Sequence, residues 1–415
     1  MTLDTVLSQA LKRIKPTGAG VLSKVRITIA AINACLTKQK IKAQAVLGGS
    51  FAKGTHLADD FDVDIFVRFD RRLYEGKDIS RLLAGAIKPF KPTRMRGSRD
   101  YFQFCRGKIQ YEIVPVLAVS FADQAVNVTD CSPLHVAWVS THIKKLHDDI
   151  RLAKQFFKAA EVYGAESYIR GFSGHVIDLL VIIHKGFIPL LTAISHWKAP
   201  VVIDVPKKHK GKALSRLNPS KTQSPLIIID PVQPDRNASA SLSHEKFHRT
   251  ITAARNFLQH PSIEGFEIRE LAIDNIKMKG PTITVTAWPV SGKRDVAGSK
   301  LLQAHELIAK ELSLFGVAES GWQWRPGKHS LHYFVLKMIQ LAPTMTIQGP
   351  PASLTIHAEA FKRKHPSAQQ VKNRLVAEEP RLEQTPQQVL KRVCASEYIT
   401  SRVKRISISG PIPRS

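Results

Sequence analysis

The stretch GGSFAKGTHLADDFDVDIFVRF, residues 48–69, contains the pattern from which the fold and the chemistry can be predicted. Two glycines and a serine precede a polar turn, and Asp62 and Asp64 then open an apolar, β-branched run. Successive side chains of a strand alternate between its faces, so these two aspartates point the same way if residues 62–69 form a strand. Two close carboxylates repel each other unless a cation lies between them. The pattern therefore indicates either a metal site or simply a strand that begins with two solvated acids.

The composition is that of a globular protein with a large basic excess. The chain has 415 residues, of which 61 are Lys or Arg and 34 are Asp or Glu, giving a formal net charge of +27. This length is sufficient for roughly two to four domains. The basic excess favours a polyanionic partner, either nucleic acid or an anionic membrane surface. A basic protein without such a partner stays an alternative on charge alone.

The cysteines and the chain start favour a reducing compartment, and we expect a cytoplasmic protein. No CxxC pair occurs among the four cysteines, so neither a zinc ribbon nor a disulfide framework is indicated. Residues 1–16 lack the long apolar core of a signal peptide. The most apolar stretch, residues 175–194, is interrupted by Asp178, His184 and Lys185, so it predicts a buried helix and no membrane span.

The first third of the chain predicts an α/β arrangement. Residues 3–40 have helical spacing, residues 43–49 predict a strand, and a short helix begins near Ser50. Residues 99–119 predict a hairpin that turns at Arg106 and Gly107, and its second arm carries Glu112. Carboxylates thus lie on two strands that we expect to be neighbours.

Beyond about His135 the chain is predominantly helical and then mixed. Residues 205–221 hold six lysines and arginines and no acid, which fits a solvated surface loop or a phosphate-contacting loop equally well. Further on, strands are predicted over 268–277, 281–290 and 329–341, with a helix over 301–316 and a proline-containing hinge over 343–353. Residues 339–415 carry 12 basic residues against 5 acids and include two helical stretches.

These features combine into one possible chemistry. A Gly-Gly-Ser turn at a helix start presents N–H donors and a hydroxyl to phosphate oxygens, and Lys53 follows within a turn. Asp62, Asp64 and Glu112 could hold two divalent ions about 3.5–4 Å apart, as used for in-line attack at phosphorus. Oxygen ligands and triphosphate chemistry select Mg²⁺ rather than zinc. The arrangement differs from a Walker A loop, because no GxxxxGK[ST] occurs.

Two sets of strings resemble known families. GGSFAKGT followed by DVDIFV resembles the nucleotidyltransferase superfamily of DNA polymerase β type. SPLHVAWV, RLAKQFFKAAEVYGAESYIRGFSGH and IIIDPVQPDRNASASLS resemble the class I, archaeal-type CCA-adding enzymes, tRNA nucleotidyltransferases that build or repair the 3′-terminal CCA without a nucleic-acid template. The resemblance is collinear from about residue 45 to 260 and weaker to about residue 365.

The resemblance implies an α+β multidomain fold. Its parts would be a polymerase β-like nucleotidyltransferase head, a helical neck, an α/β body and a basic helical RNA-binding tail. By residues these are the head at 1–140, the neck or central domain at 141–258, the body at 259–338 and the tail at 339–415.

The resemblance also implies roles for individual residues. Asp62, Asp64 and Glu112 correspond to the catalytic, metal-binding carboxylates, although relatives usually have aspartate at the third position. The positions that correspond to nucleotide-binding residues are Ser50, Lys53, His135, Lys154, Tyr163 and Arg236. Taken singly, most of these would more often be structural residues, and only their joint occurrence in order favours the functional interpretation.

The activity implied is addition and repair of the tRNA 3′-terminal CCA from CTP and ATP, with release of pyrophosphate. Two Mg²⁺ ions would assist attack of the RNA 3′-hydroxyl on the α-phosphate. The implied partners are ATP, CTP and the acceptor stem and T arm of tRNA, with a homodimer left open. The alternatives are a related transferase with another acceptor, either poly(A)-type or CC-limited, and a catalytically inactive basic RNA-binding protein. Retention of all three carboxylates argues against the last.

Overall fold

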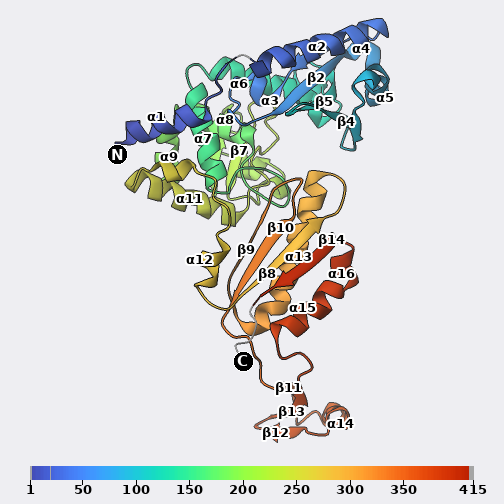
Figure 1. Ribbon diagram of the computed structural model, residues 1–415, viewed down its shortest axis with the longest axis vertical. Helices are drawn as coiled ribbons and strands as arrows, with labels where there is room; N and C mark the ends of the chain where they lie inside the picture. Colours follow the sequence, from blue (N-terminus) through green and yellow to red (C-terminus); the bar gives the residue numbers. More distant parts are fainter. Residues whose placement is uncertain (1, 19, 411–415) are drawn as a thin grey trace. The chain divides into compact units, whose positions relative to one another are not determined.

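The computed structural model describes residues 2–18 and 20–410 and divides the chain into two compact units, residues 1–269 and 270–415 (Figure 1). The N-terminal unit contains a five-stranded sheet of order β1-β2-β5-β4-β3. Its strands are β1 (Ala43–Leu47), β2 (Asp62–Asp70), β3 (Thr93–Met95), β4 (Tyr101–Arg106) and β5 (Ile109–Ala118). The predicted strand at residues 62–69 and the predicted hairpin are both confirmed.

The sheet has one apolar face and one polar face over β2. Val63, Ile65 and Val67 are buried, and they join one core with α2 (Gly20–Lys38) and α5 (Ile79–Ala86). Because side chains alternate along a strand, Asp62 and Asp64 lie on the opposite face. Burial of the β-branched residues therefore fixes the direction of the two carboxylates.

The start of the segment that joins β1 to β2 packs against Asp64. After β1 the chain enters α3 (Gly49–Ala52), and the amide of Gly48 donates to the backbone carbonyl of Asp64 at 2.8 Å. Gly49 has φ +55, and a Cβ atom on it would lie 1.8 Å from Asp64 Oδ2. Only glycine tolerates both the left-handed backbone and this approach.

Helices and a small sheet make up the rest of the N-terminal unit. Their shared core is apolar and rich in phenylalanine, with Phe156, Phe187, Phe257 and Phe266 in mutual ring contact. Strands β6 (Val201–Asp204) and β7 (Leu226–Ile229) pair in parallel beside them. The helices are α1 (Leu3–Ile14), α6 (Ser132–His142), α7 (His147–Ala159), α8 (Gly174–His184), α9 (Phe187–Ser195) and α11 (His244–Gln259).

Two apolar helical segments have the length and composition of a membrane span among the residues described. The helix α2 passes this test, yet Val25, Ile32 and Leu36 are buried in the core beside the five-stranded sheet. Helices α8 and α9 pass only as a pair, and they are bent by 95° at their junction. The expected buried helix at residues 175–194 is thus two helices, both packed in the core.

The C-terminal unit contains a four-stranded antiparallel sheet of order β14-β8-β10-β9. The core lies between one face of this sheet and helices α13 (Arg294–Leu312) and α15 (Pro386–Ala395). The strands are β8 (Thr282–Pro289), β9 (Val317–Trp324), β10 (Ser330–Leu336) and β14 (Val403–Ser409).

Two sequence predictions in the C-terminal unit are wrong. Residues 268–277 contain no strand but the helix α12 (Ile273–Lys277), because Ile273 and Ile276, three residues apart, pack together against Tyr333 and Val335. The helical tail is wrong as a description of residues 339–410, although its two predicted helical stretches are confirmed as α14 (Thr355–Lys364) and α15. The same residues also contain α16 (Glu397–Thr400), the sheet β11-β13-β12 and the strand β14, which pairs with β8.

The prolines that predicted a hinge over residues 343–353 lie in or beside a small sheet instead. Its strands are β11 (Thr344–Pro351), β12 (Gln369–Val371) and β13 (Arg374–Pro380). Of the prolines that suggested a hinge, Pro343 directly precedes β11, and Pro350 and Pro351 lie at the end of this edge strand, where a missing N–H donor costs no ladder bond. The buried alternation of Leu375 and Ala377 anchors the central strand β13.

We predict that Gly49→Ala destabilises the N-terminal unit by about 1–3 kcal/mol, the usual cost of a left-handed non-glycine residue. The added Cβ also forces the Asp64 carboxylate out of its position. The measurement is the free energy of unfolding from chemical denaturation. Gly20→Ala is the matched control, because Gly20 opens α2 without a positive φ and no atom lies within 4 Å of where its Cβ would stand. Equal stability of the two variants would contradict the argument.

Candidate active site

The polar face of the five-stranded sheet brings the predicted carboxylates together. Strands β2 and β5 pair in parallel, and their register sets Asp64 directly beside Glu112 and Asp62 beside Gln110. From β4, the side-chain amide of Gln103 donates to Glu112 Oε2 at 2.9 Å. This bond holds the longer glutamate side chain in a fixed direction, at the position where aspartate was expected.

The environment of Asp64 suits a bound cation. Burial raises the pKa of Asp64, and the neighbouring Glu112 carboxylate raises it further, so that its pKa reaches about 7 although Lys53 opposes the shift. Divalent cations relieve such repulsion and take oxygen ligands. Together with the cradle at Gly49, this donor set fits the magnesium ions implied by the sequence.

The turn that carries Ser50 and Lys53 is fixed to the helical domain by a buried ion pair. Lys53 contacts the Asp178 carboxylate of α8 directly, and Lys154 Nζ of α7 lies 3.3 Å from the other Asp178 oxygen. Lys154 also donates to Thr55 Oγ1 at 2.9 Å. The Thr55 amide in turn donates to the Ser50 carbonyl at 2.9 Å. Two predicted nucleotide contacts, Lys53 and Lys154, thus share one carboxylate.

Asp178 is anionic in this arrangement. Its side chain is 0% exposed, and burial by itself would raise its pKa, but the charges of Lys154 and Lys53 outweigh this effect and hold its pKa below the ordinary range. Burial lowers the pKa of Lys154, while Asp178 opposes the shift. The two neighbouring ammonium groups thus stabilise the charged form of the buried Asp178 carboxylate.

A second buried carboxylate gathers three further side chains. His135 Nε2 of α6 lies 2.9 and 2.8 Å from the two oxygens of Asp230, the residue after β7. His175 Nε2 of α8 lies 3.6 Å from Asp230 Oδ2, and Arg236 Nη1 lies 3.7 Å from the same oxygen. The predicted residues His135 and Arg236 therefore meet at a residue that the sequence analysis did not single out.

The same cluster has the ligand types of a metal site, but its surroundings argue against one. Single ligand atoms of His135, His175 and Asp230 all lie within 4.8 Å of one another. However, Asp230 Oδ1 already accepts from the amides of Val232 and Gln233, at 2.9 and 3.1 Å. The Arg236 guanidinium adds a positive charge beside the carboxylate. We therefore interpret the cluster as a hydrogen-bonded network and keep the metal assignment for Asp62, Asp64 and Glu112.

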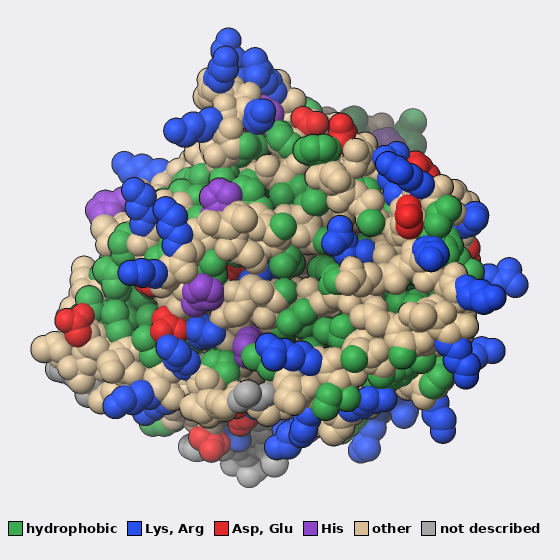
Figure 2. Space-filling model, turned by 90° about the horizontal axis from the view of Figure 1, so that it is seen from above, with side chains coloured by type: hydrophobic (Ala, Val, Ile, Leu, Met, Phe, Trp, Pro, Cys, Tyr) green, Lys and Arg blue, Asp and Glu red, His purple; other side chains and the backbone are tan. Residues whose placement is uncertain are grey.

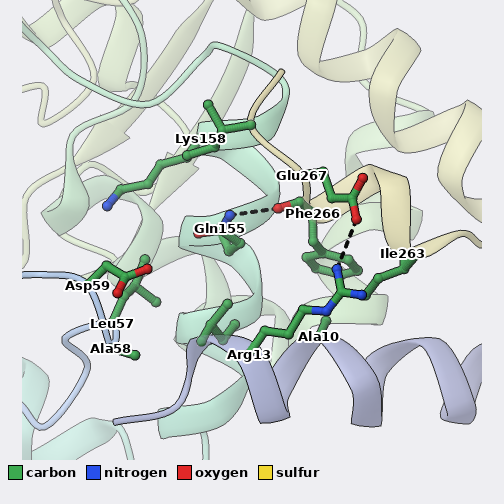
Figure 3. Close-up of a pocket in the computed structure, with 12 residues that line it drawn as sticks. Ala10, Arg13, Leu57, Ala58, Asp59, Gln155, Lys158, Ile263, Phe266 and Glu267 are labelled. Carbon is green, nitrogen blue, oxygen red and sulfur yellow. Dashed lines mark hydrogen bonds and ion pairs between the residues drawn. The ribbon is translucent and has the colours of Figure 1, made fainter. Parts of the chain in front are cut away.

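Tyr163 is a partly buried member of the site's predicted residues. Burial raises its pKa, and the charges of Asp60 and Asp178 raise it further, so its phenol is neutral. Lys158 Nζ lies 5.2 Å from the centre of the Tyr163 ring. This lysine also lines a pocket of about 490 Å³ with Asp59, Gln155 and Phe266 (Figure 3). None of the predicted site residues lines this pocket.

Three functional candidates escaped the sequence analysis: Asp178, His175 and Asp230. Signals for them existed. Asp178 interrupts an otherwise apolar helix, and Asp230 directly follows four consecutive apolar residues of the buried strand β7. Buried charges are expensive unless they are paired, so an aspartate inside an apolar run indicates a partner elsewhere in the fold.

The outer surface agrees with an anionic ligand. The face drawn in Figure 2 carries many lysine and arginine side chains and few acidic ones. In residues 205–221 the basic side chains are exposed, while His209 and Leu217 are buried and His209 Nε2 bonds the Pro234 carbonyl at 2.8 Å. The basic loop is thus anchored to the segment that carries Arg236.

Comparison with known proteins supports the predicted resemblance to nucleotidyltransferases. The family model described as "Nucleotidyltransferase domain" matches residues 30–118, and the one described as "tRNA nucleotidyltransferase, second domain" matches residues 148–267. The CCA-adding enzyme of Nanoarchaeum equitans is 34% identical over 323 residues, covering 77% of this chain and 79% of the relative. That of Methanothermobacter thermautotrophicus is 28% identical over 397 residues, covering 91% and 86%.

Among solved structures, Cid1, whose title names an RNA terminal uridylyl transferase activity, aligns with a TM-score of 0.51 at 14% identity. The alignment covers 64% of this chain and 98% of Cid1. At this identity the likeness shows a shared nucleotidyltransferase fold.

The raised pKa of Asp64 predicts a pH-dependent stability in metal-free protein. The folded state holds the Asp64 proton up to about pH 7, whereas the unfolded chain releases it near 3.8. Stability should therefore fall as the pH rises between these values and stay level above them. Asp64→Asn removes this loss, so the variant should exceed the native protein by up to about 4 kcal/mol at alkaline pH and match it near pH 4.

Melting temperatures measured in EDTA between about pH 4 and pH 8 test this expectation. Asp59→Asn is the matched control, because it removes an exposed acid from the same segment. Native protein and Asp64→Asn with parallel pH profiles would refute the proposed repulsion.

Proposed function

Because this chain belongs to the family of CCA-adding enzymes, we propose that it builds and repairs the 3′-terminal CCA of tRNA, using CTP and ATP and releasing pyrophosphate. The observation that supports this most directly is the juxtaposition of Asp64 with Glu112 beside the Gly-Gly-Ser turn. Nucleotidyl transfer needs clustered carboxylates next to a phosphate-binding turn, and this face of the sheet supplies both.

Asp62, Asp64 and Glu112 are the proposed ligands of two Mg²⁺ ions. When bound, the ions would lower the pKa of the RNA 3′-hydroxyl and neutralise charge on the triphosphate. The raised pKa of Asp64 supports this role, since two adjacent carboxylates without a cation repel each other. Gln103 orients Glu112, and the close approach of Gly49 fixes the Asp64 carboxylate.

The reaction is a displacement at the α-phosphorus. The RNA 3′-oxygen forms the new phosphodiester bond, the bond between the α-phosphorus and the bridging oxygen breaks, and pyrophosphate leaves with that electron pair. The hydroxyl proton passes to solvent. The contribution of this chain is alignment and charge, as expected for phosphoryl transfer.

The remaining predicted residues are proposed to hold the nucleotide. Ser50 and Lys53 would contact the triphosphate, and Lys154 and His135 would add positive charge or hydrogen-bond donors near it. Tyr163 would supply a neutral phenol, because burial raises its pKa. Arg236 is the proposed reader of the base edge. Its side chain is 43% exposed, which leaves donors available to a ligand.

The proposed RNA partner is the acceptor stem and T arm of tRNA, recognised by shape and phosphate contacts. The exposed basic side chains of residues 205–221 and the basic excess of residues 339–415 support this assignment. The division into head, neck, body and tail also stays a proposal, although the strand β14 of the tail pairs with β8 of the body in one sheet. We further propose a cytoplasmic location.

The metal assignment predicts that Asp64→Asn lowers single-turnover CMP incorporation by about 10²–10³-fold or more, because a charge needed in the transition state is lost. The measurement is incorporation onto tRNA lacking its CCA, over a series of Mg²⁺ concentrations. Asp59→Asn should incorporate CMP at the native rate. Near-native incorporation by Asp64→Asn would eliminate the metal role of this residue.

The substrate assignment predicts that a tRNA transcript lacking CCA, supplied with all four nucleoside triphosphates, gains C, C and A in that order. A minihelix of acceptor stem and T arm should also be extended. Sequencing the 3′ ends of both products gives the answer. Runs of A would indicate a poly(A)-type transferase, products ending after two C residues a CC-limited enzyme, and no addition an inactive RNA-binding protein.

A further inference from the structure

Asp230 is a buried aspartate whose polar contacts come both from its own loop and from neighbouring helices. Its side chain is 0% exposed. It accepts from His135 on α6 and from two amides of its own loop, and His175 and Arg236 lie within ion-pair distance. A buried carboxylate with this many partners is costly to perturb and orients each partner in turn.

We propose that Asp230 is a positioning residue of the nucleotide site, holding His135 and Arg236 in the geometry that receives the nucleotide. The inference rests on the proposed function, which assigns nucleotide contacts to these two side chains. Asp230 itself would touch no substrate, because its oxygens are buried and already engaged by the protein.

The loop geometry links Arg236 to Asp230 twice. The Asp230 amide donates to the Arg236 carbonyl at 3.0 Å, and the Ala238 amide donates to the Ile228 carbonyl at 2.8 Å. Ile229 also forms an isolated bridge with Asn237, so residues 230–236 close into a short loop. The Asp230 carboxylate then fixes the start of this loop through the amides of Val232 and Gln233. Arg236 is thus placed by both its backbone and its guanidinium.

His135 approaches from another element, which makes the contact more than loop capping. Helix α6 carries His135, and α8 carries His175, whose ring centre lies 4.6 Å from that of His135. Burial by itself would raise the pKa of Asp230, but the hydrogen bonds of the two imidazoles outweigh it, and the pKa lies well below the ordinary range. The permanent negative charge orients donors from three separate segments toward one point.

The test is Asp230→Asn, which keeps the shape of the side chain. The Asn oxygen can still accept from the loop amides, but its NH₂ group presents donors where His135 and Arg236 also donate. We expect the CTP dissociation constant and KM to rise by about tenfold to hundredfold, with kcat nearly unchanged and discrimination against UTP and GTP reduced. Calorimetric titration with CTP gives the dissociation constant without RNA, and steady-state kinetics at saturating tRNA give the rest.

Asp204→Asn is the matched control. Asp204 ends β6, the parallel neighbour of β7, and its carboxylate caps the amides of Lys208 and His209 at 3.2 and 2.8 Å. It is therefore a comparable loop-capping aspartate with no predicted nucleotide residue among its hydrogen-bond partners. CTP affinity in this variant should match that of the native protein. An equal loss in both variants would reduce Asp230 to a loop cap and overturn the proposal.

Other results are equally decisive. Unchanged CTP affinity in Asp230→Asn would overturn the proposal, and so would a fall in kcat alone.

If Asp230→Asn does not fold, a double-mutant cycle on His135→Gln and Arg236→Ala replaces it, because both leave the buried carboxylate in place. Their effects on CTP affinity should be non-additive if one group positions both, and additivity would refute this. Native protein that binds CTP but extends no RNA contradicts the proposed function and not this inference.

Discussion

The parallel register between β2 and β5 is the constraint on which the site depends. A shift of one residue would turn Asp64 into the apolar core or set it beside Ile113, since strand side chains alternate. The register is held by the buried Val63, Ile65 and Val67 on one face, which cannot face water without loss of their burial energy. The hydrophobic core thus sets the distance between two carboxylates that repel each other, and a cation at the proposed metal site would remove this repulsion.

The ion pairs of Asp178 connect the turn after β1 to the helices α7 and α8. Lys53 belongs to the turn after β1, whereas Asp178 and Lys154 belong to α8 and α7. Loss of one partner would leave a buried charge uncompensated, which typically costs about 3–5 kcal/mol. The turn and the helical core are therefore joined by charge as well as by packing. Asp230 makes an equivalent connection between α6, α8 and the loop after β7.

The sequence was most informative where local pattern and tertiary structure agree. The alternation at residues 62–69 predicted the strand, and the spacing of Gly48, Gly49 and Ser50 predicted the turn. The close contact between the Gly49 backbone and the Asp64 carboxylate, which leaves no room for a Cβ atom, was not predictable, because it depends on how β1 and β2 pair. Residues 268–277 show the opposite case, since contacts with β10 selected a helix over the predicted strand. The partners of Asp178 and Asp230 are separated from them by up to 125 residues, so only the folded chain identifies them.

Lysine at position 53 matters for how such a site can work. An arginine fork makes directional, bidentate bonds and exchanges partners with difficulty, whereas an ammonium group is a compact charge with three donors. In the proposed nucleotide site, Lys53 would keep its contact with Asp178 and direct another donor to a phosphate oxygen. Asp178 compensates one of the two lysine charges, so two protonated lysines and this carboxylate would together carry a net charge of about +1 and not +2. Under the proposed function a triphosphate would meet this reduced positive charge, and the Asp178 carboxylate between the two ammonium groups lowers the repulsion between them.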